Sequence, residues 1–258
     1  MPSKIEWTEE TWNPITGCTK KSEGCRHCYA EVMARRLQAM GTKGYENGFK
    51  LTLQPHRLEE PLKNKKSTMY FVNSMSDLFH EDVPFEYIDR VFDVIKSTPQ
   101  HKYQVLTKRA EQMEYYFQNR QVPQNVWLGV TVENKSSIFR IDYLRRIKNV
   151  SVKFLSVEPL LEDLGFVDFS KIDWVIVGGE SGPLARPMKK EWALNIKEQC
   201  DEQNIAFFFK QWGTWGEDNK KRSKKENGHT INQKEYREMP FKIQKKKYIF
   251  PFSSKSPI

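Results

Sequence analysis

Short apolar segments alternate with longer amphipathic segments through most of the chain, and this alternation limits the fold more than any other feature. Parallel strands covered by helices on both faces have nearly continuous apolar sequences, so the pattern predicts a parallel α/β fold. The predicted strands are 68–77, 103–108, 126–134, 152–159, 173–181 and 205–213, with a seventh near 12–17. The predicted helices are 28–40, 86–97, 109–118, 136–147 and 189–203. Residues 41–67 have neither pattern, and we expect an insertion or a long loop there.

Polar residues and glycines stand where the predicted strands end. In parallel α/β folds the carboxyl ends of the strands meet at one ligand site, so these residues predict one large polar pocket. Some of them have a simpler role as caps of the following helices. The residues concerned are Asn73, Ser74, Ser76, Asp77, Thr107, Lys108, Thr131, Glu133, Ser156, Glu158, Gly178, Gly179, Glu180, Ser181, Lys210 and Gln211.

Three of the four cysteines stand close together in residues 17–29, which we call the cysteine loop. They are Cys18, Cys25 and Cys28, and a predicted helix follows them. A structural zinc site would need a fourth ligand, for which the candidates are His27, His80 and Cys200. His27 lies inside the C-x2-C step, a poor position for binding the same ion, and Cys200 is more simply a half-buried helix residue. Three thiolates without a fourth protein ligand suit a 4Fe-4S cluster with one iron open to a small molecule. The loop precedes the first helix, which would place such a cluster at the mouth of the polar pocket.

The positive charge of the chain is concentrated near its end. The net charge is +9, and residues 217–258 hold twelve Lys and Arg against five Asp and Glu, so residues 1–216 are close to neutral. We therefore expect one domain over 1–216 and a basic extension over 217–258. The extension mixes lysine with aromatic residues and suits a nucleic-acid backbone, a partner protein or simple exposure to solvent.

Neither a secretory signal nor a membrane span is expected from the sequence. The opening residues contain no apolar segment after the first lysine, and no run of about eighteen apolar residues occurs elsewhere. We therefore expect a cytoplasmic protein, a compartment in which clustered thiols stay reduced.

The ordered blocks of the sequence resemble a known superfamily. A three-cysteine loop on strands of this kind is similar to the radical S-adenosylmethionine superfamily, although the spacing here is C-x6-C-x2-C rather than C-x3-C-x2-C. More narrowly, the chain resembles a bacterial and phage family of radical-SAM-like proteins named after phage gene products 37 and 68. The matching blocks are "WNPITGCTKKSEGCRHCYAE", "NSMSDLFHEDVP", "VLTKR", "GVTVEN", "SVEPLL", "VGGESGPLARPM" and "FFFKQWG".

The resemblance implies a fold, two cofactors and a reaction. The fold would be a partial or complete TIM-like (β/α) barrel. Cys18, Cys25 and Cys28 would hold a 4Fe-4S cluster whose open iron binds S-adenosylmethionine. One-electron reduction would release methionine and a 5′-deoxyadenosyl radical that takes hydrogen from a substrate. The electron would come from a donor of flavodoxin or ferredoxin type.

The resemblance also suggests roles for individual residues. His27 would pack beside the cofactor, and Ser74, Ser76 and Asp77 are candidates for its amino group. Other cofactor contacts are expected from Thr131, Glu133, Ser156, Glu158 and the segment Gly178, Gly179 and Glu180. A polar or anionic substrate would meet Lys108, Arg109, Arg186, Lys210 and Gln211, although Lys108 and Arg109 would also fit a solvent-facing helix start.

Two alternatives come from other classes of protein. The first is a zinc-bearing nucleic-acid-binding protein without catalysis, in which a histidine completes the site of the three cysteines. The second is a hydrolase that uses strand-end carboxylates, but no H-x-H, Ser-His-Asp or H-E-x-x-H arrangement supports it.

Overall fold

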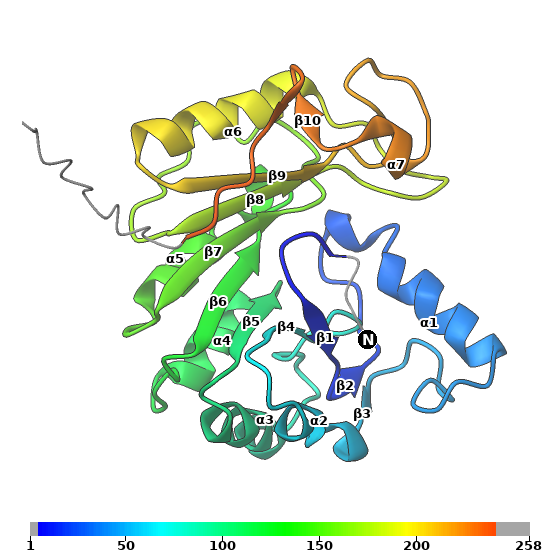
Figure 1. The fold of residues 1–258 in the computed structure, drawn as a ribbon, viewed down its shortest axis with the longest axis vertical. Coiled ribbons are helices and arrows are strands. Elements are labelled where there is room, and N and C mark those ends of the chain that lie inside the picture. The colour runs from blue at the N-terminus through cyan, green and yellow to red at the C-terminus, as the bar shows by residue number, and fades with distance from the viewer. Residues whose placement is uncertain (1–4, 241–258) are drawn as a thin grey trace, which may run out of the picture.

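The computed structural model describes residues 5–240 (Figure 1). The lysine-rich and aromatic segment 242–252, on which part of the nucleic-acid hypothesis rests, lies outside the described residues. Within the described part of the chain, the longest helices have 13 residues. None of those helices has the length and apolar character that crossing a bilayer requires.

A seven-stranded parallel sheet forms the centre of the molecule, with the strands in the order in which they occur along the chain. Each strand pairs in parallel with the next. Among the described residues β1 and β9 do not pair, so the sheet curves into an open half-barrel (Figure 1). The strands are β1 (Glu10–Trp12), β4 (Met69–Val72), β5 (Lys102–Thr107), β6 (Val126–Thr131), β7 (Val152–Val157), β8 (Trp174–Gly178) and β9 (Ala206–Gln211). The predicted parallel α/β fold is confirmed, as the partial form of the barrel.

Helices cover the outer face of this sheet. Residues of alternate strand positions pack with the apolar faces of four helices into one large core. These helices are α3 (Phe85–Ser97), α4 (Ala110–Phe117), α5 (Arg140–Arg146) and α6 (Lys190–Glu202). In α3, for example, Ile88, Val91 and Ile95 are completely buried, as their helical spacing predicts.

The inner face of the half-barrel is filled by aromatic residues. Trp127, Phe154 and Trp174 point inward from three neighbouring strands. Trp7, from the segment before β1, packs into the same cluster with its ring 4.7 Å from that of Phe71. The Trp7 backbone carbonyl accepts a hydrogen bond of 3.1 Å from the buried Gln104 side chain. The N-terminal segment thus fills part of the inner face of the half-barrel.

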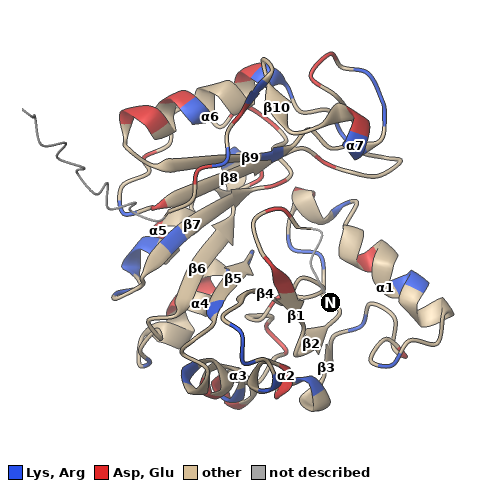
Figure 2. Cartoon of the chain, viewed as in Figure 1, with Lys and Arg blue, Asp and Glu red and all other residues tan. Residues whose placement is uncertain are grey.

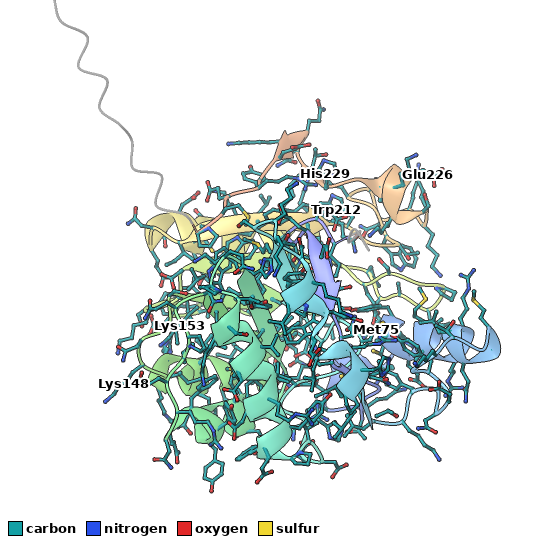
Figure 3. All side chains as sticks on the ribbon, turned by 60° about the horizontal axis from the view of Figure 1, so that its bottom comes forward. Met75, Lys148, Lys153, Trp212, Glu226 and His229 are labelled. Carbon is teal, nitrogen blue, oxygen red and sulfur yellow. The ribbon has the colours of Figure 1, made fainter. Side chains whose placement is uncertain are left out.

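The connection from β1 to β4 is more structured than the sequence predicts. The predicted seventh strand near 12–17 is divided, since β1 ends at Trp12 and β2 (Ile15–Thr16) pairs antiparallel with β3 (Thr52–Leu53). The predicted loop 41–67 contains β3, a 3-10 helix (Pro55–Arg57) and α2 (Glu60–Lys63). Helix α1 (Tyr29–Ala39) lies apart from the sheet and packs on the loop around Tyr45 and on Met75 (Figures 1 and 3).

Residues 217–240 fold back onto β8 and β9. They include α7 (Lys224–Asn227) and the hairpin of β10 (Thr230–Ile231) and β11 (Lys234–Glu235). The Trp212 indole donates 2.7 Å to the carbonyl of Thr230, and the Trp174 indole donates 2.8 Å to that of Glu238. This part of the basic extension is therefore packed against the half-barrel.

Candidate functional site

One cavity of about 550 Å³ lies at the carboxyl ends of the strands. All three cysteines of the cysteine loop line it, together with residues at or directly after the carboxyl ends of six of the seven sheet strands. The predicted site residues that line it are Cys18, Cys25, His27, Cys28, Ser74, Ser76, Asp77, Lys108, Thr131, Ser156, Glu158, Gly179, Glu180, Lys210 and Gln211. The lining does not include Glu133, Gly178 and Arg186, for which sequence analysis predicted ligand contacts.

The cysteines enter the cavity from three points of the cysteine loop. Cys18 follows β2, Cys25 ends a 3-10 helix (Glu23–Cys25), and Cys28 directly precedes α1. All three are free and half-buried. Among the described residues, no three His, Cys, Asp or Glu side chains are grouped to hold one metal ion. In a 4Fe-4S cluster each thiolate binds its own iron, so three separated thiols around one cavity fit that group better than a single zinc ion.

The first half of the loop is held by a buried guanidinium. Arg109 is 2% exposed, which excludes the predicted solvent-facing alternative for this residue. It donates to the Thr19 hydroxyl at 2.9 Å, to the Thr19 carbonyl at 3.3 Å and to the Cys18 sulfur at 3.6 Å. Burial raises the pKa of Cys18 to about 11; Asp77 acts in the same direction, whereas Arg109 opposes the rise.

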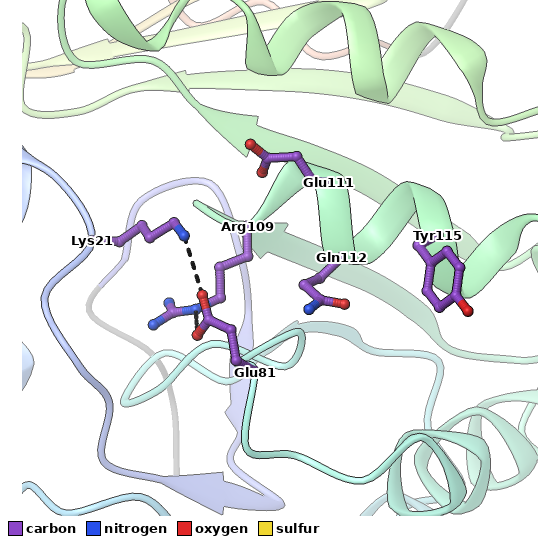
Figure 4. A pocket seen from close by; sticks show the side chains of 6 residues that line it. All are labelled: Lys21, Glu81, Arg109, Glu111, Gln112 and Tyr115. Carbon is purple, nitrogen blue, oxygen red and sulfur yellow. Dashed lines mark hydrogen bonds and ion pairs between the residues drawn. The ribbon is translucent and has the colours of Figure 1, made fainter.

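Two carboxylates hold Arg109 in turn. Asp77 accepts from Arg109 at 3.2 Å, from the Thr107 hydroxyl at 2.7 Å and from two backbone amides, so both of its oxygens are already engaged. Glu81 accepts from Arg109 at 2.6 Å and from Lys21 at 3.2 Å (Figure 4). Burial alone would raise the pKa of Glu81, but the hydrogen bonds from Arg109, from the backbone amide of Glu81 and from Lys21 together outweigh it and lower the pKa to about 2.

The chain of contacts from Lys21 to Arg109 separates the cavity from a second, more open hollow. This hollow has a volume of about 530 Å³. It is lined by Lys21, Glu81, Arg109, Glu111, Gln112 and Tyr115 (Figure 4). Arg109 therefore lies between two spaces, with the cysteine loop on one side and the start of α4 on the other.

The second half of the loop rests on Glu133, which is completely buried. Its carboxylate pairs with Lys108 at 2.9 Å and with Arg140 at 2.7 Å, and it accepts a hydrogen bond from the Ser22 hydroxyl. Burial alone would raise the pKa of Glu133, but the two cations outweigh it and lower the pKa to about 2. A Cβ atom on Gly24 would lie 2.6 Å from this side chain. Glu133 thus supports the cysteine loop, and the cofactor contact that sequence analysis expected of it stays a prediction.

Arg186 holds the loop at a third point. Its guanidinium forms two bonds to the Glu180 carboxylate, at 2.7 and 2.9 Å, and a bond of 3.0 Å to the Glu23 carbonyl. Arg186 thus joins the loop after β8 to the cysteine loop, and its expected role in substrate binding stays a prediction. Burial alone would raise the pKa of Glu180, but the bonds from Arg186 outweigh it and lower the pKa.

Glu158 and Lys210 face the cavity as an ion pair with a separation of 3.2 Å. Gly178 lies behind this pair and makes room for it, since a Cβ atom there would lie 2.4 Å from a Glu158 oxygen. Gly179 permits a close backbone approach, because a Cβ atom there would lie 1.9 Å from the Trp212 carbonyl oxygen. At both positions glycine is needed because a side chain would occupy space that a neighbouring group already fills.

Several buried polar atoms around the cavity have no partner in the described structure. They are both side-chain amide atoms of Asn73, the indole nitrogen of Trp7 and the side-chain oxygen Oε1 of Gln211. Asn73 directly follows β4 and has a φ of 60°, a conformation that Asn adopts more readily than most residues. Buried polar atoms almost always have partners, so these atoms favour a polar ligand or ordered water in the cavity. The sequence signal for Asn73 was its place at a strand end, whereas Trp7 carried no signal.

The structure thus defines an open α/β half-barrel whose cysteine loop covers a polar cavity. A family model described as "Protein of unknown function (DUF5131)" matches residues 2–240, and the chain belongs to this family. No curated protein matches the chain.

Three similar solved structures are all of spore photoproduct lyase. A cysteine variant has 14% identity and a TM-score of 0.48, and the match covers 78% of this chain and 63% of that one. A complex with dinucleoside spore photoproduct has 13% identity and a TM-score of 0.44, and the match covers 78% of this chain and 63% of that one. A variant with bound AdoMet and dinucleoside spore photoproduct has 12% identity and a TM-score of 0.45, and the match covers 76% of this chain and 62% of that one. The chain spans less than two thirds of these proteins, and likenesses this weak assign neither ligand nor activity to it.

Proposed function

We propose that this chain is an iron-sulfur enzyme of the radical S-adenosylmethionine type. Cys18, Cys25 and Cys28 would hold a 4Fe-4S cluster, and the 550 Å³ cavity would take S-adenosylmethionine together with the reacting part of a substrate. The observation that carries the proposal is the opening of all three thiols into the cavity at the carboxyl ends of the parallel strands. Membership in the family named after phage gene products 37 and 68 remains part of this proposal.

The residues around the cavity suit these groups. Three free thiols line the cavity, the number that a cluster with one open iron requires. When bound, the two cofactors together supply a 5′-deoxyadenosyl radical, formed by one-electron cleavage of the S–C5′ bond with release of methionine. The unpartnered side-chain amide of Asn73 and the side-chain oxygen of Gln211 offer hydrogen bonds to the polar groups of a small molecule.

The protein would position these groups and protect them from water. Arg109 and Glu133 fix the two halves of the cysteine loop. Burial raises the pKa of Cys28, and the backbone amides of Glu31 and Ala30 only partly oppose this rise, so iron binding would release a proton from this thiol. The aromatic cluster beneath the cavity, with Trp7 and Phe71 at its floor, excludes water from that side.

Two partners and a compartment follow from the proposed chemistry. The reaction consumes one electron, for which we expect a donor of flavodoxin or ferredoxin type. The basic extension supports nucleic acid or a nucleotide as substrate. We expect the reaction to take place in the cytoplasm, where the thiols remain reduced.

The decisive experiment is anaerobic reconstitution with iron and sulfide, followed by metal analysis and visible spectroscopy. We expect roughly four irons per chain and, after reduction with dithionite, cleavage of S-adenosylmethionine to 5′-deoxyadenosine and methionine. The Cys25→Ala variant should lose both iron and cleavage. Cys200→Ala is the matched control, because Cys200 is fully buried in α6, outside the loop, and its loss should leave iron and cleavage unchanged.

Two results would overturn the proposal. Stoichiometric zinc in a colourless protein after reconstitution would support the zinc-bearing alternative. Equal iron content in the Cys25→Ala and Cys200→Ala variants would show that the cysteine loop does not hold the metal.

A further inference from the structure

A run of basic residues lies at the mouth of the cavity. Residues 220–225 have the sequence KKRSKK, and all six are exposed. Figure 2 shows this run in the loop that leads into α7. Lys224 itself lines the cavity, so this lysine turn reaches the site directly.

The lysine turn has a defined conformation. The Trp215 indole before it donates 2.7 Å to the Ala185 carbonyl. The Asn227 amide after it donates to the carbonyls of Gly213 and Thr214, at 3.0 and 2.9 Å. Within the turn, the Ser223 side chain and that of Glu226 cap α7 reciprocally. The lysines are thus presented from a fixed scaffold, which lowers the entropy lost when a ligand binds them.

The cations of the turn are poorly neutralised by the protein. Among the described residues, Lys220 and Lys225 take part in no ion pair, and Lys224 has only a contact of 3.7 Å with Glu6. Arg222 is paired with Asp218, and Lys221 lies over the ring of Trp215. The mouth therefore carries a net positive charge that attracts an anionic ligand.

The acids around the cavity do not cancel this attraction. Each of them pairs with a cation of its own, as described above for Asp77, Glu133, Glu158 and Glu180. Repulsion of phosphate by these carboxylates is thus reduced inside the cavity, and the unpaired lysines decide the charge at its mouth.

The opposite lip of the mouth is apolar. Tyr29 and Met33 of α1 line the cavity and remain 58% and 42% exposed. Val32 and Met40, at helical spacing from them, extend this surface along α1 and are even more exposed. An aromatic ring and a thioether in such positions can stack against a base, while the lysines hold the phosphates.

We propose that the mouth binds single-stranded nucleic acid, with its phosphates on the lysine turn and an unstacked base between Tyr29 and Met33 at the entrance of the cavity. The inference rests on the proposed function in one respect, namely that this base would be the substrate of the proposed reaction. Single strands are favoured over duplexes because the bases of a duplex are stacked inside the helix and cannot reach α1.

The test is fluorescence anisotropy with a labelled single-stranded oligonucleotide, using the full reconstituted chain. The variant Lys220→Glu, Lys224→Glu, Lys225→Glu reverses three charges at the mouth. The matched control is Lys65→Glu, Lys66→Glu, Lys148→Glu, which makes the same charge change in residues that precede β4 and β7. Lys148 and Glu226, the residue directly after the lysine turn, lie on opposite sides of the molecule (Figure 3).

We expect the mouth variant to bind about tenfold more weakly than the control and to show a smaller dependence of log K on log salt, by about 0.7 per lost phosphate contact. Equal binding by the two variants would overturn the proposal, as would a duplex that binds as tightly as the single strand. Iron content, measured on the same samples, should be equal in both variants. If the unsubstituted protein holds no iron and does not cleave S-adenosylmethionine, the proposed function is wrong, while the binding difference would still stand.

Discussion

The two halves of the cysteine loop are held by opposite charges. The first half, around Cys18 and Thr19, receives hydrogen bonds from the Arg109 guanidinium. The second half, around Ser22 and Gly24, lies on the Glu133 carboxylate. In both cases the charged group is buried and is neutralised by partners that follow neighbouring strands.

The difference between the two supports predicts different consequences of their loss. Arg109 contacts a cysteine sulfur directly, so its removal should affect both folding and the position of that thiol. Glu133 has no recorded contact with a cysteine among the described residues and acts through Ser22 and the close approach of Gly24. Its removal should affect stability more than the cavity itself.

The largest effect is expected for Arg109→Met. This change leaves the buried carboxylate of Asp77 without its cation, and breaking a buried ion pair costs about 3 to 5 kcal/mol. Urea unfolding of the metal-free reduced protein measures the loss. The control is Arg120→Met, whose pair with Asp89 is partly exposed and should contribute about 1 kcal/mol. Similar losses of unfolding free energy in the two variants would show that Arg109 stabilises the protein no more than a partly exposed ion pair does.

A somewhat smaller and pH-dependent effect is expected for Glu133→Gln. The folded-state pKa of Glu133, about 2, lies below its ordinary value of 4.5, which corresponds to about 3 kcal/mol at neutral pH. Because the folded pKa is depressed, this stabilisation is present above pH 4.5 and is lost as the pH falls towards 2. The difference in unfolding free energy between wild type and variant should therefore shrink over that range.

Urea titrations at several pH values between 7 and 3 check this expectation. Glu111→Gln, at a residue that lines the outer hollow on α4, is a suitable control for the general effect of acid. A difference between wild type and Glu133→Gln that stays constant with pH would contradict the proposed ionised state of Glu133.

Gly24→Ala tests the steric part of the second support. The added Cβ would lie 2.6 Å from the buried Glu133 side chain, so the loop must shift away and carry Cys25 with it. We expect a loss of about 1 to 3 kcal/mol, together with a lower iron content after reconstitution. Lys21→Ala in the same loop is the control, since its exposed contact with Glu81 should contribute less than about 1 kcal/mol. Normal iron content in Gly24→Ala would show that the loop tolerates the shift.

The sequence allowed the sheet and much of the cavity lining to be predicted, because both depend on local patterns. Apolar runs predicted the parallel strands, and polar residues after them, such as Ser76 and Thr131, do line the cavity. The direction of a side chain relative to other strands is not a local property. Arg109 lines the cavity, yet no sequence pattern marks its burial between Asp77 and the cysteine loop. Nor does a pattern mark the complete burial of Glu133 between Lys108 and Arg140.

Two further parts of the structure depend on contacts that no sequence pattern marks. Trp7 precedes the first strand without any periodic neighbours, yet it fills the inner face of the half-barrel. The charge of residues 217–240 suggested an extension, but Trp212, Trp174 and Ile231 fix this segment on the domain. In both cases large aromatic side chains bury apolar area against distant strands, which outweighs the local polarity of the segment.

The smallest effect is expected at the third support, for Glu23→Gln. The carboxylate of Glu23 is half exposed and lies 3.3 Å from Arg186, and an exposed pair of this kind contributes less than about 1 kcal/mol. The Glu23 carbonyl still accepts from Arg186 in the variant, so the position of the loop should not change. Urea unfolding and iron content should therefore match the wild type within error. A loss as large as that of Glu133→Gln would mean that exposed contacts support the loop as much as buried ones, and the contrast between its two buried supports would then lose its meaning.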